Sequence, residues 1–176
     1  MFREIPRMFS FESPGKYATP VAERKEVKKE MDAPKIRVVL VSHGEMSKGM
    51  LNSVQMLLGP QENIAAYSLY PEQTTVDLAD QLRKEVETYG AENIVFMSEL
   101  KLGSPFNAVV SLTRDYDLHH ITGVNLAMLM TVIMERDDES ATPASLCEAA
   151  METAQDSIAD VRKMLAAESD EEEEEL

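Results

Sequence analysis

The sequence of 176 residues is poor in cysteine and histidine and contains no long apolar run. Cys147 is the only cysteine, so no internal disulfide can form, which fits a reducing cytoplasm. With this single thiol and three histidines, two of them adjacent, we expect no structural metal site, and nothing in the sequence asks for a cofactor. No apolar stretch reaches the length of a membrane span, and the first residues lack the apolar segment of a secretory signal. These absences predict a soluble cytoplasmic protein.

Basic residues are also scarce, because 17 Lys and Arg stand against 32 Asp and Glu, for a net charge of −15. Residues 168–176 carry seven acids and no base, whereas residues 1–34 have a net charge of +1, which leaves −9 on the part between them. An acidic surface repels nucleic acid and anionic lipid and favours a basic protein partner. We therefore expect no nucleic-acid binding.

Composition divides the chain into three parts. Four prolines and three aperiodic phenylalanines in residues 1–34 indicate a flexible extension. Residues 35–167 carry regular hydrophobic patterns and form the predicted domain. Residues 168–176 are predicted to be a disordered acidic tail.

Within the domain, short apolar runs alternate with helical patterns. Strands are expected at 36–41, 64–69, 94–97 and 121–124, and helices after each of them, the last at 143–167. This alternation predicts an α/β fold with a mostly parallel open sheet and helices on both faces. Right-handed crossovers bring the carboxyl ends of parallel strands to one edge of the sheet. His43, the 99–104 loop and the 123–125 turn would gather there, whereas His119 and His120 are expected to be loop residues.

The first candidate site residue is His43, which ends the apolar run that begins at Val38. Gly44 follows directly, and a helical pattern begins within a few residues. In open α/β sheets, ligands and chemistry collect in the crevice at such strand ends. His43 is therefore a candidate nucleophile or proton acceptor.

The second candidate motif, residues 99–107, also lies between a strand and a helix. Gly103 allows close approach of a ligand to the backbone, and Ser104 stands at the expected helix cap, where free N–H groups favour an anion. Glu99 can accept a hydrogen bond from one imidazole nitrogen and leave the other free. Together these residues suit a phosphohistidine site. Read alone, the same motif is also compatible with ordinary helix capping and a solvated carboxylate.

Three ordered motifs resemble the enzyme IIA domain of the mannose-type sugar phosphotransferase system. They are Ser42-His43-Gly44-Glu45, Gly103-Ser104-Pro105-Phe106-Asn107 and Thr122-Gly123-Val124-Asn125-Leu126. The resemblance runs from about Ile36 to Met134. It implies that His43 accepts phosphoryl from the histidine-containing phosphocarrier protein and passes it to a IIB domain. It also implies a membrane association only through transporter subunits, and Gly44, Gly103 and Ser104 are then expected at the phosphate.

The resemblance further implies a homodimer with an exchanged antiparallel edge strand, for which residues near Arg136–Thr142 are the candidates. Three residues depart from the family pattern of aspartate, leucine, an aromatic residue and Gly-Gly-Ser-Pro. Glu99 replaces the aspartate and is longer by one methylene. Lys101 replaces the aromatic residue, and Leu102 replaces the first glycine, although leucine lacks the easy left-handed conformation of glycine.

Three other functions are alternatives to this one. A regulatory or binding domain of the same fold is one, supported by the altered 99–102 loop. A component of dihydroxyacetone phosphorylation is another. A hydrolase using Ser42 or Ser104 is the third, but neither serine lies in a Gly-x-Ser-x-Gly turn.

Overall fold

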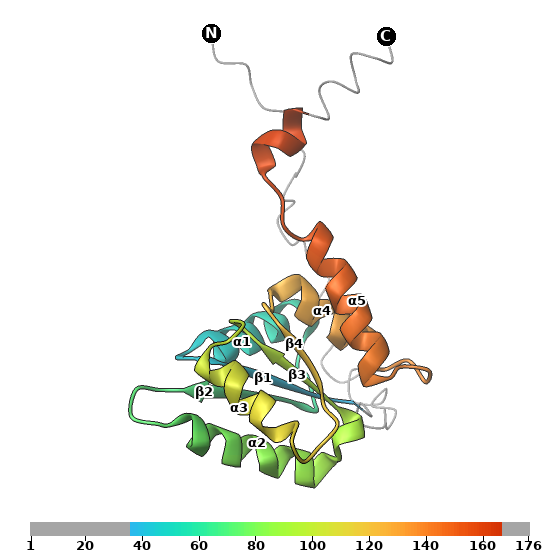
Figure 1. Cartoon of the computed structure of the whole chain (residues 1–176). Coiled ribbons are helices and arrows are strands. Elements are labelled where there is room, and N and C mark those ends of the chain that lie inside the picture. Colours follow the sequence, from blue (N-terminus) through green and yellow to red (C-terminus); the bar gives the residue numbers. More distant parts are fainter. Residues whose placement is uncertain (1–35, 167–176) are drawn as a thin grey trace, which may run out of the picture. The chain divides into compact units, whose positions relative to one another are not determined.

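The computed structural model describes residues 36–166 (Figure 1). The predicted amino-terminal extension, residues 1–34, and the predicted acidic tail, residues 168–176, lie outside the described residues. In the described part, no helix is both long enough and apolar enough to cross a membrane.

Four parallel strands form the centre of the domain. They are β1 (Arg37–His43), β2 (Ile64–Leu69), β3 (Ile94–Ser98) and β4 (His119–Thr122), in the spatial order β2-β1-β3-β4. Strands β1 and β3 are almost continuously buried, as expected for a sheet covered on both faces. The α/β prediction with a parallel sheet is confirmed.

Helices cover the two faces of this sheet in unequal numbers. Helices α1 (Met46–Leu58), α4 (Leu126–Glu135) and α5 (Pro143–Asp156) pack on one face, over Val38, Leu40 and Met97. Helices α2 (Thr75–Tyr89) and α3 (Ser104–Leu112) pack on the other face, and a short 3₁₀ turn, η2 (Ala91–Asn93), follows α2. Alternate residues of each strand supply the two apolar cores, because successive side chains of a strand point to opposite faces.

The helix ends follow the local signals of the sequence. Thr74 forms a capping box with Asp77 at the start of α2, and Asn125 caps α4 through the N–H of Met128. Gly59 and Gly90, both with positive φ, end α1 and α2. One cap differs from the prediction: α3 starts at Ser104, with Gly103 and not Ser104 at the N-cap position.

The fourth strand begins two residues earlier than the sequence predicts. His119 and His120 are its first residues and not a loop pair. The apolar pattern of residues 121–124 misplaced the strand because the half-buried His120 contacts side chains of α3 and β3, which the pattern does not reveal. Its ring lies 5.2 Å from that of Phe106, and its Nε2 lies 2.8 Å from Ser98 Oγ.

The segment predicted as an exchanged strand, Arg136–Thr142, forms a series of turns between α4 and α5. Arg136, 2% exposed, donates hydrogen bonds to the carbonyls of Glu62 and Asn63 and to the Gln61 side chain. Asp138 accepts hydrogen bonds from the N–H and hydroxyl of Ser140. These contacts hold the segment in turns in the single chain described here, and an exchanged edge strand in a homodimer stays a prediction.

The final helix is shorter than predicted. The helix α5 ends at Asp156, four non-helical residues follow, and residues 161–166 are helical again. Leu146 and Ala150 of α5 are buried, whereas Ile158, Val161 and Leu165 are 79%, 60% and 57% exposed. The helical pattern continues in the sequence, but no part of the described domain packs against it.

Candidate active site

His43 is the last residue of β1, at the carboxyl edge of the sheet. Its side chain is 47% exposed, although the five preceding strand residues are buried. The parallel register puts His43 beside Leu69 of β2 and Val41 beside Ser98 of β3, so Glu99 follows on the neighbouring strand. The structure therefore brings together the two motifs that the sequence singles out.

Glu99 contacts His43 at two points. One carboxylate oxygen, Oε1, accepts a hydrogen bond of 2.7 Å from the backbone N–H of His43 and also accepts from the ring nitrogen Nδ1. A carboxylate can only accept, so the Nδ1 proton is held on the ring and the lone pair of Nε2 is left available. Within the described residues, no hydrogen bond to Nε2 is found. The longer glutamate side chain thus still reaches the imidazole, and at 13% exposure it is shielded from solvent.

Gly44 forms the turn that follows His43. Its φ of +50° is in the left-handed region, which turns the chain from β1 into α1. Its N–H donates to the carbonyl of Leu69 at 3.0 Å and is therefore already used. Gly44 shapes the turn after His43, and its expected place at the phosphate stays a prediction.

Gly103 lies directly beside the imidazole. A Cβ atom added there would stand 3.2 Å from Cε1 of His43 and 3.2 Å from the carbonyl oxygen of Leu100. Few real Cβ atoms have contacts this close, and the carbonyl is a backbone atom that cannot move aside cheaply. Gly103 therefore allows the ring to lie against the start of α3.

The first turn of α3 offers free donors next to that ring. No side chain caps the helix, and Pro105 has no N–H, so within the described residues the N–H groups of Ser104 and Phe106 have no hydrogen-bond partner. The Ser104 hydroxyl lies in the same half-buried turn. Unpaired N–H groups and the helix dipole attract an anion here. Phe106 is a contributor that the sequence analysis did not single out, because a backbone group leaves no signal in residue type.

A buried serine cluster supports the turn from below. Ser42 Oγ accepts a hydrogen bond of 2.7 Å from the N–H of Ser47, and the hydroxyl of Ser47 donates to the carbonyl of Tyr67 and contacts Ser68. All three serines are at most 9% exposed. The cluster fixes the start of α1 to β1 and β2. Ser42 is therefore occupied in this framework and is not placed as the nucleophile of a hydrolase.

A polar group also flanks His43 on the β2 side. The Tyr70 hydroxyl donates to Glu45, and Lys48 Nζ lies 2.6 Å from that hydroxyl and 3.7 Å from the Glu45 carboxylate. These three side chains come from the β1–α1 turn, α1 and the end of β2. They give this side of the site a mixed charge.

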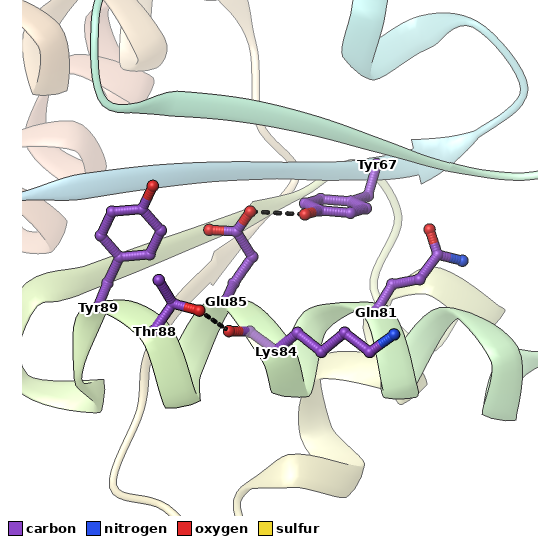
Figure 2. A pocket seen from close by; sticks show the side chains of 6 residues that line it. All are labelled: Tyr67, Gln81, Lys84, Glu85, Thr88 and Tyr89. Carbon is purple, nitrogen blue, oxygen red and sulfur yellow. Dashed lines mark hydrogen bonds between the residues drawn. The ribbon is translucent and has the colours of Figure 1, made fainter.

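A hollow of about 390 Å³ lies between β2 and α2 and is lined by none of the predicted site residues (Figure 2). Within it, Glu85 accepts two hydrogen bonds of 2.9 Å from Arg37 and one of 2.5 Å from the Tyr67 hydroxyl. Burial and the contact with Glu85 raise the pKa of Tyr67. Since both Glu85 oxygens are used within the domain, this network joins α2 to the sheet.

Cys147 and the histidine pair carry no sign of chemistry. Cys147 packs beside the apolar core that lies between the sheet and helices α1, α4 and α5. Burial raises the pKa of its thiol to about 11, which disfavours the reactive thiolate. Burial lowers the pKa of His120 to about 4, so this ring is neutral at physiological pH. In the described residues, no group of three or more His, Cys, Asp and Glu side chains could hold a metal ion.

The fold and the site together define a class of protein: an open parallel α/β domain with a histidine–carboxylate pair at the carboxyl edge of its sheet, facing a helix start. The chain belongs to the mannose-type EIIA family of the sugar phosphotransferase system (PTS). The family model described as "PTS system fructose IIA component" matches residues 37–151.

Curated relatives and solved structures agree with this family. The chain is 30% identical over 106 residues to the mannose-specific EIIAB component of Escherichia coli K12. The aligned residues make up 59% of this chain and 33% of that protein. It is 29% identical over 114 residues to the sorbose-specific EIIA component of Klebsiella pneumoniae, covering 64% of this chain and 82% of that one. The chain thus spans about a third of the length of the mannose-specific relatives that it matches.

Among solved structures, the EIIA component from Streptococcus agalactiae is similar in fold, with a TM-score of 0.67 and 24% identity. The match covers 73% of this chain and 98% of that one. At this identity the similarity supports the fold, and membership of the family rests on the family model.

Proposed function

We propose that His43 carries the phosphoryl group, accepting it from a histidine-containing phosphocarrier protein and passing it to a IIB domain. The observation that carries this proposal is the hydrogen bond between Glu99 and Nδ1, which leaves Nε2 of an exposed ring as the free nucleophile. The proposed setting is the cytoplasm, with a membrane reached only through transporter subunits. The expected homodimer stays a prediction.

The transfer itself needs only groups that the chain contains. Nε2 of neutral His43 attacks the phosphorus atom of the donor phosphohistidine in line. A new N–P bond forms as the donor N–P bond breaks, and the donor imidazole leaves with that electron pair. The proton on Nδ1 stays on His43, where Glu99 stabilises the positive charge that the ring acquires.

The start of α3 supplies the groups that stabilise the negative charge of the transferred phosphoryl group. Three equatorial oxygens share the charge of the transferred group. The N–H groups of Ser104 and Phe106 and the Ser104 hydroxyl are the candidate donors to these oxygens, since Gly103 brings the ring against this turn. Gly44 contributes the turn that presents His43.

The proposal is tested with a phosphorylated carrier protein whose phosphoryl group is radiolabelled. We expect the chain to become labelled and His43→Gln to remain unlabelled, because glutamine keeps a polar side chain but has no nucleophilic nitrogen. Ser42→Ala is a control for turn stability, and it should retain labelling. Full labelling of His43→Gln would overturn the proposal.

Addition of a IIB domain then separates a transport component from a regulatory domain of the same fold. Transfer of the label to IIB supports the proposed role. Stable label on His43 in the presence of several IIB domains would favour the regulatory function.

A further inference from the structure

One side chain outside the proposed transfer machinery contacts both elements that build it. The ring centroid of His120, in β4, lies 5.2 Å from that of Phe106 in the first turn of α3, with 40° between the ring planes. The Nε2 atom of His120 lies 2.8 Å from the hydroxyl oxygen of Ser98, the last residue of β3. Ser98 directly precedes Glu99, whose carboxylate accepts from Nδ1 of His43. His120 thus contacts the start of α3 and also the strand that carries the carboxylate.

The strands bring this contact to the same face of the sheet as His43. Successive side chains of a strand point to opposite faces. Val41 packs in the core beneath α2 and α3, so His43 lies on that face of β1. Ile121 packs in the opposite core, so His120 lies on the α2–α3 face of β4. Ser98, which bonds to His120, belongs to β3, the strand between these two.

The first turn of α3 depends on packing for its position. Among the described residues, no side chain caps this helix. The inward contacts of the turn include the buried Pro105 and the ring contact of Phe106 with His120. The backbone N–H of Phe106 is one of the candidate donors to the phosphoryl oxygens. A contact that fixes the Phe106 side chain therefore also fixes the direction of this N–H.

The His120 ring is itself held in place. Ser98 is 0% exposed, and its hydroxyl has the imidazole as hydrogen-bond partner. This bond sets the rotation of the imidazole, and with it the face that meets Phe106. Because burial lowers the pKa of His120 to about 4, the ring is neutral and can lie against Phe106 without a counter-ion.

We propose that His120 is a positioning residue for phosphoryl transfer, which acts through Phe106 to hold the first turn of α3 against His43. This inference rests on the proposed function of His43. His120 does not touch the transferred group. It keeps the N–H donors of Ser104 and Phe106 aligned with the phosphoryl oxygens, so its loss should affect the transfer step and not the binding of the carrier protein.

The experiment measures transfer from the phosphorylated carrier protein to His120→Gln and His120→Phe. Glutamine can still bond to Ser98 but has no ring, whereas phenylalanine keeps a ring beside Phe106. We expect kcat to fall about tenfold in His120→Gln with the KM for the carrier unchanged, because small displacements of reacting groups cost large rate factors. His120→Phe should recover most of this rate, and a His120→Phe variant as slow as His120→Gln would overturn the proposal.

His119→Gln is the matched control. His119 is the neighbouring residue of β4 and lies on the opposite face of the sheet, so this variant should transfer at the parent rate. Thermal unfolding of each variant ensures that every rate is measured on folded chains. An equal decrease of kcat in His119→Gln and His120→Gln would overturn the proposal, because the effect would then not depend on the contact with Phe106.

A double-variant cycle tests whether His120 acts through Phe106. Phe106→Leu removes the partner ring but keeps the backbone N–H, and it should slow transfer by a factor similar to that of His120→Gln. The double variant should be no slower than either single variant, because both remove the same contact. Losses that multiply in the double variant would overturn the proposal, since the two residues would then act independently.

Phosphoramidate, a small phosphoryl donor that needs no docking surface, separates this inference from the proposed function. We expect it to label His43 of the parent chain, and to label His120→Gln about tenfold more slowly. Parent rates in His120→Gln with both donors, or an effect confined to the carrier protein, would overturn the positioning role and leave the proposed function intact. Failure of both donors to label the parent chain at His43 would instead overturn the proposed function.

Discussion

At the scale of single residues, the close approach of Gly103 to the His43 ring is the contact that most specifically requires one residue type. Gly103 has an ordinary backbone conformation, with φ of −69°. Glycine is therefore required at this position because the space beside the His43 ring is too small for a Cβ atom, and not because of the backbone torsion. Gly103→Ala should displace the imidazole or the Leu100 carbonyl. We expect labelling of His43 to slow by about tenfold, since small misplacements of reacting groups cost large rate factors. Gly49→Ala is the matched control, because an added Cβ there meets no atom within 4 Å.

His120 allows a prediction about pH. Burial lowers its pKa to about 4 in the folded chain, against about 6.5 in the unfolded chain. The unfolded state therefore binds more protons between these values, and stability is lost as the pH falls from about 6.5 towards 4. The full effect is about 3 kcal/mol. Urea unfolding as a function of pH measures it.

The matched variants for this prediction are His120→Gln and His119→Gln. Glutamine can keep a hydrogen bond to Ser98 but does not titrate, so His120→Gln should flatten the pH dependence. His119 points to the other face of the sheet, because alternate strand residues do. His119→Gln should keep the dependence, and a loss in this variant alone would show that the wrong histidine was assigned.

At the scale of secondary-structure elements, the Glu85 network ties α2 to the sheet. Glu85→Ala would leave Arg37, with a side chain 13% exposed, without its counter-ion and Tyr67 without its acceptor. Breaking such a buried pair from one side should lower the free energy of unfolding by about 3 kcal/mol. Asp115→Ala removes the exposed pair with Arg83 and should have no resolvable effect. Equal losses in the two variants would contradict this explanation.

The elements also show where sequence patterns were sufficient. The second strand was predicted at its observed bounds, and Thr74, Gly59 and Gly90 mark helix ends that the structure has. These features depend on near neighbours in the chain. The fourth strand and the end of α5 depend on contacts between distant residues. His120 is a strand residue because Phe106 and Ser98 receive it, and Ile158 is exposed because nothing in the described domain covers it.

Some residues of the candidate site could likewise be predicted from the sequence, and others could not. His43, Glu99, Gly103 and Ser104 could be chosen from the sequence because strand ends of a parallel sheet meet at one edge. Three backbone features could not be predicted, because backbone geometry leaves little signal in residue type. They are the hydrogen bond from the Gly44 amide to Leu69, the free N–H of Phe106 and the left-handed conformation of Leu102.

At the scale of the whole molecule, charge governs the encounter with partners. With a net charge of −15, the chain should attract a basic donor protein over a distance that salt shortens. We expect kcat/KM for transfer from the carrier protein to fall by about tenfold between low salt and about 0.5 M salt. Labelling by phosphoramidate, itself an anion, should not fall. A parallel decrease with both donors would indicate an effect of salt on the chain and not on the encounter.

The most direct test of the account identifies the nitrogen that carries the phosphoryl group. The chain, labelled with ¹⁵N in histidine and phosphorylated by the carrier protein, is examined by ³¹P–¹⁵N NMR correlation. The contact of Glu99 with Nδ1 predicts a single phosphorus coupled to Nε2 of His43. A phosphorus atom coupled to Nδ1, or attached to His119 or His120, would contradict it.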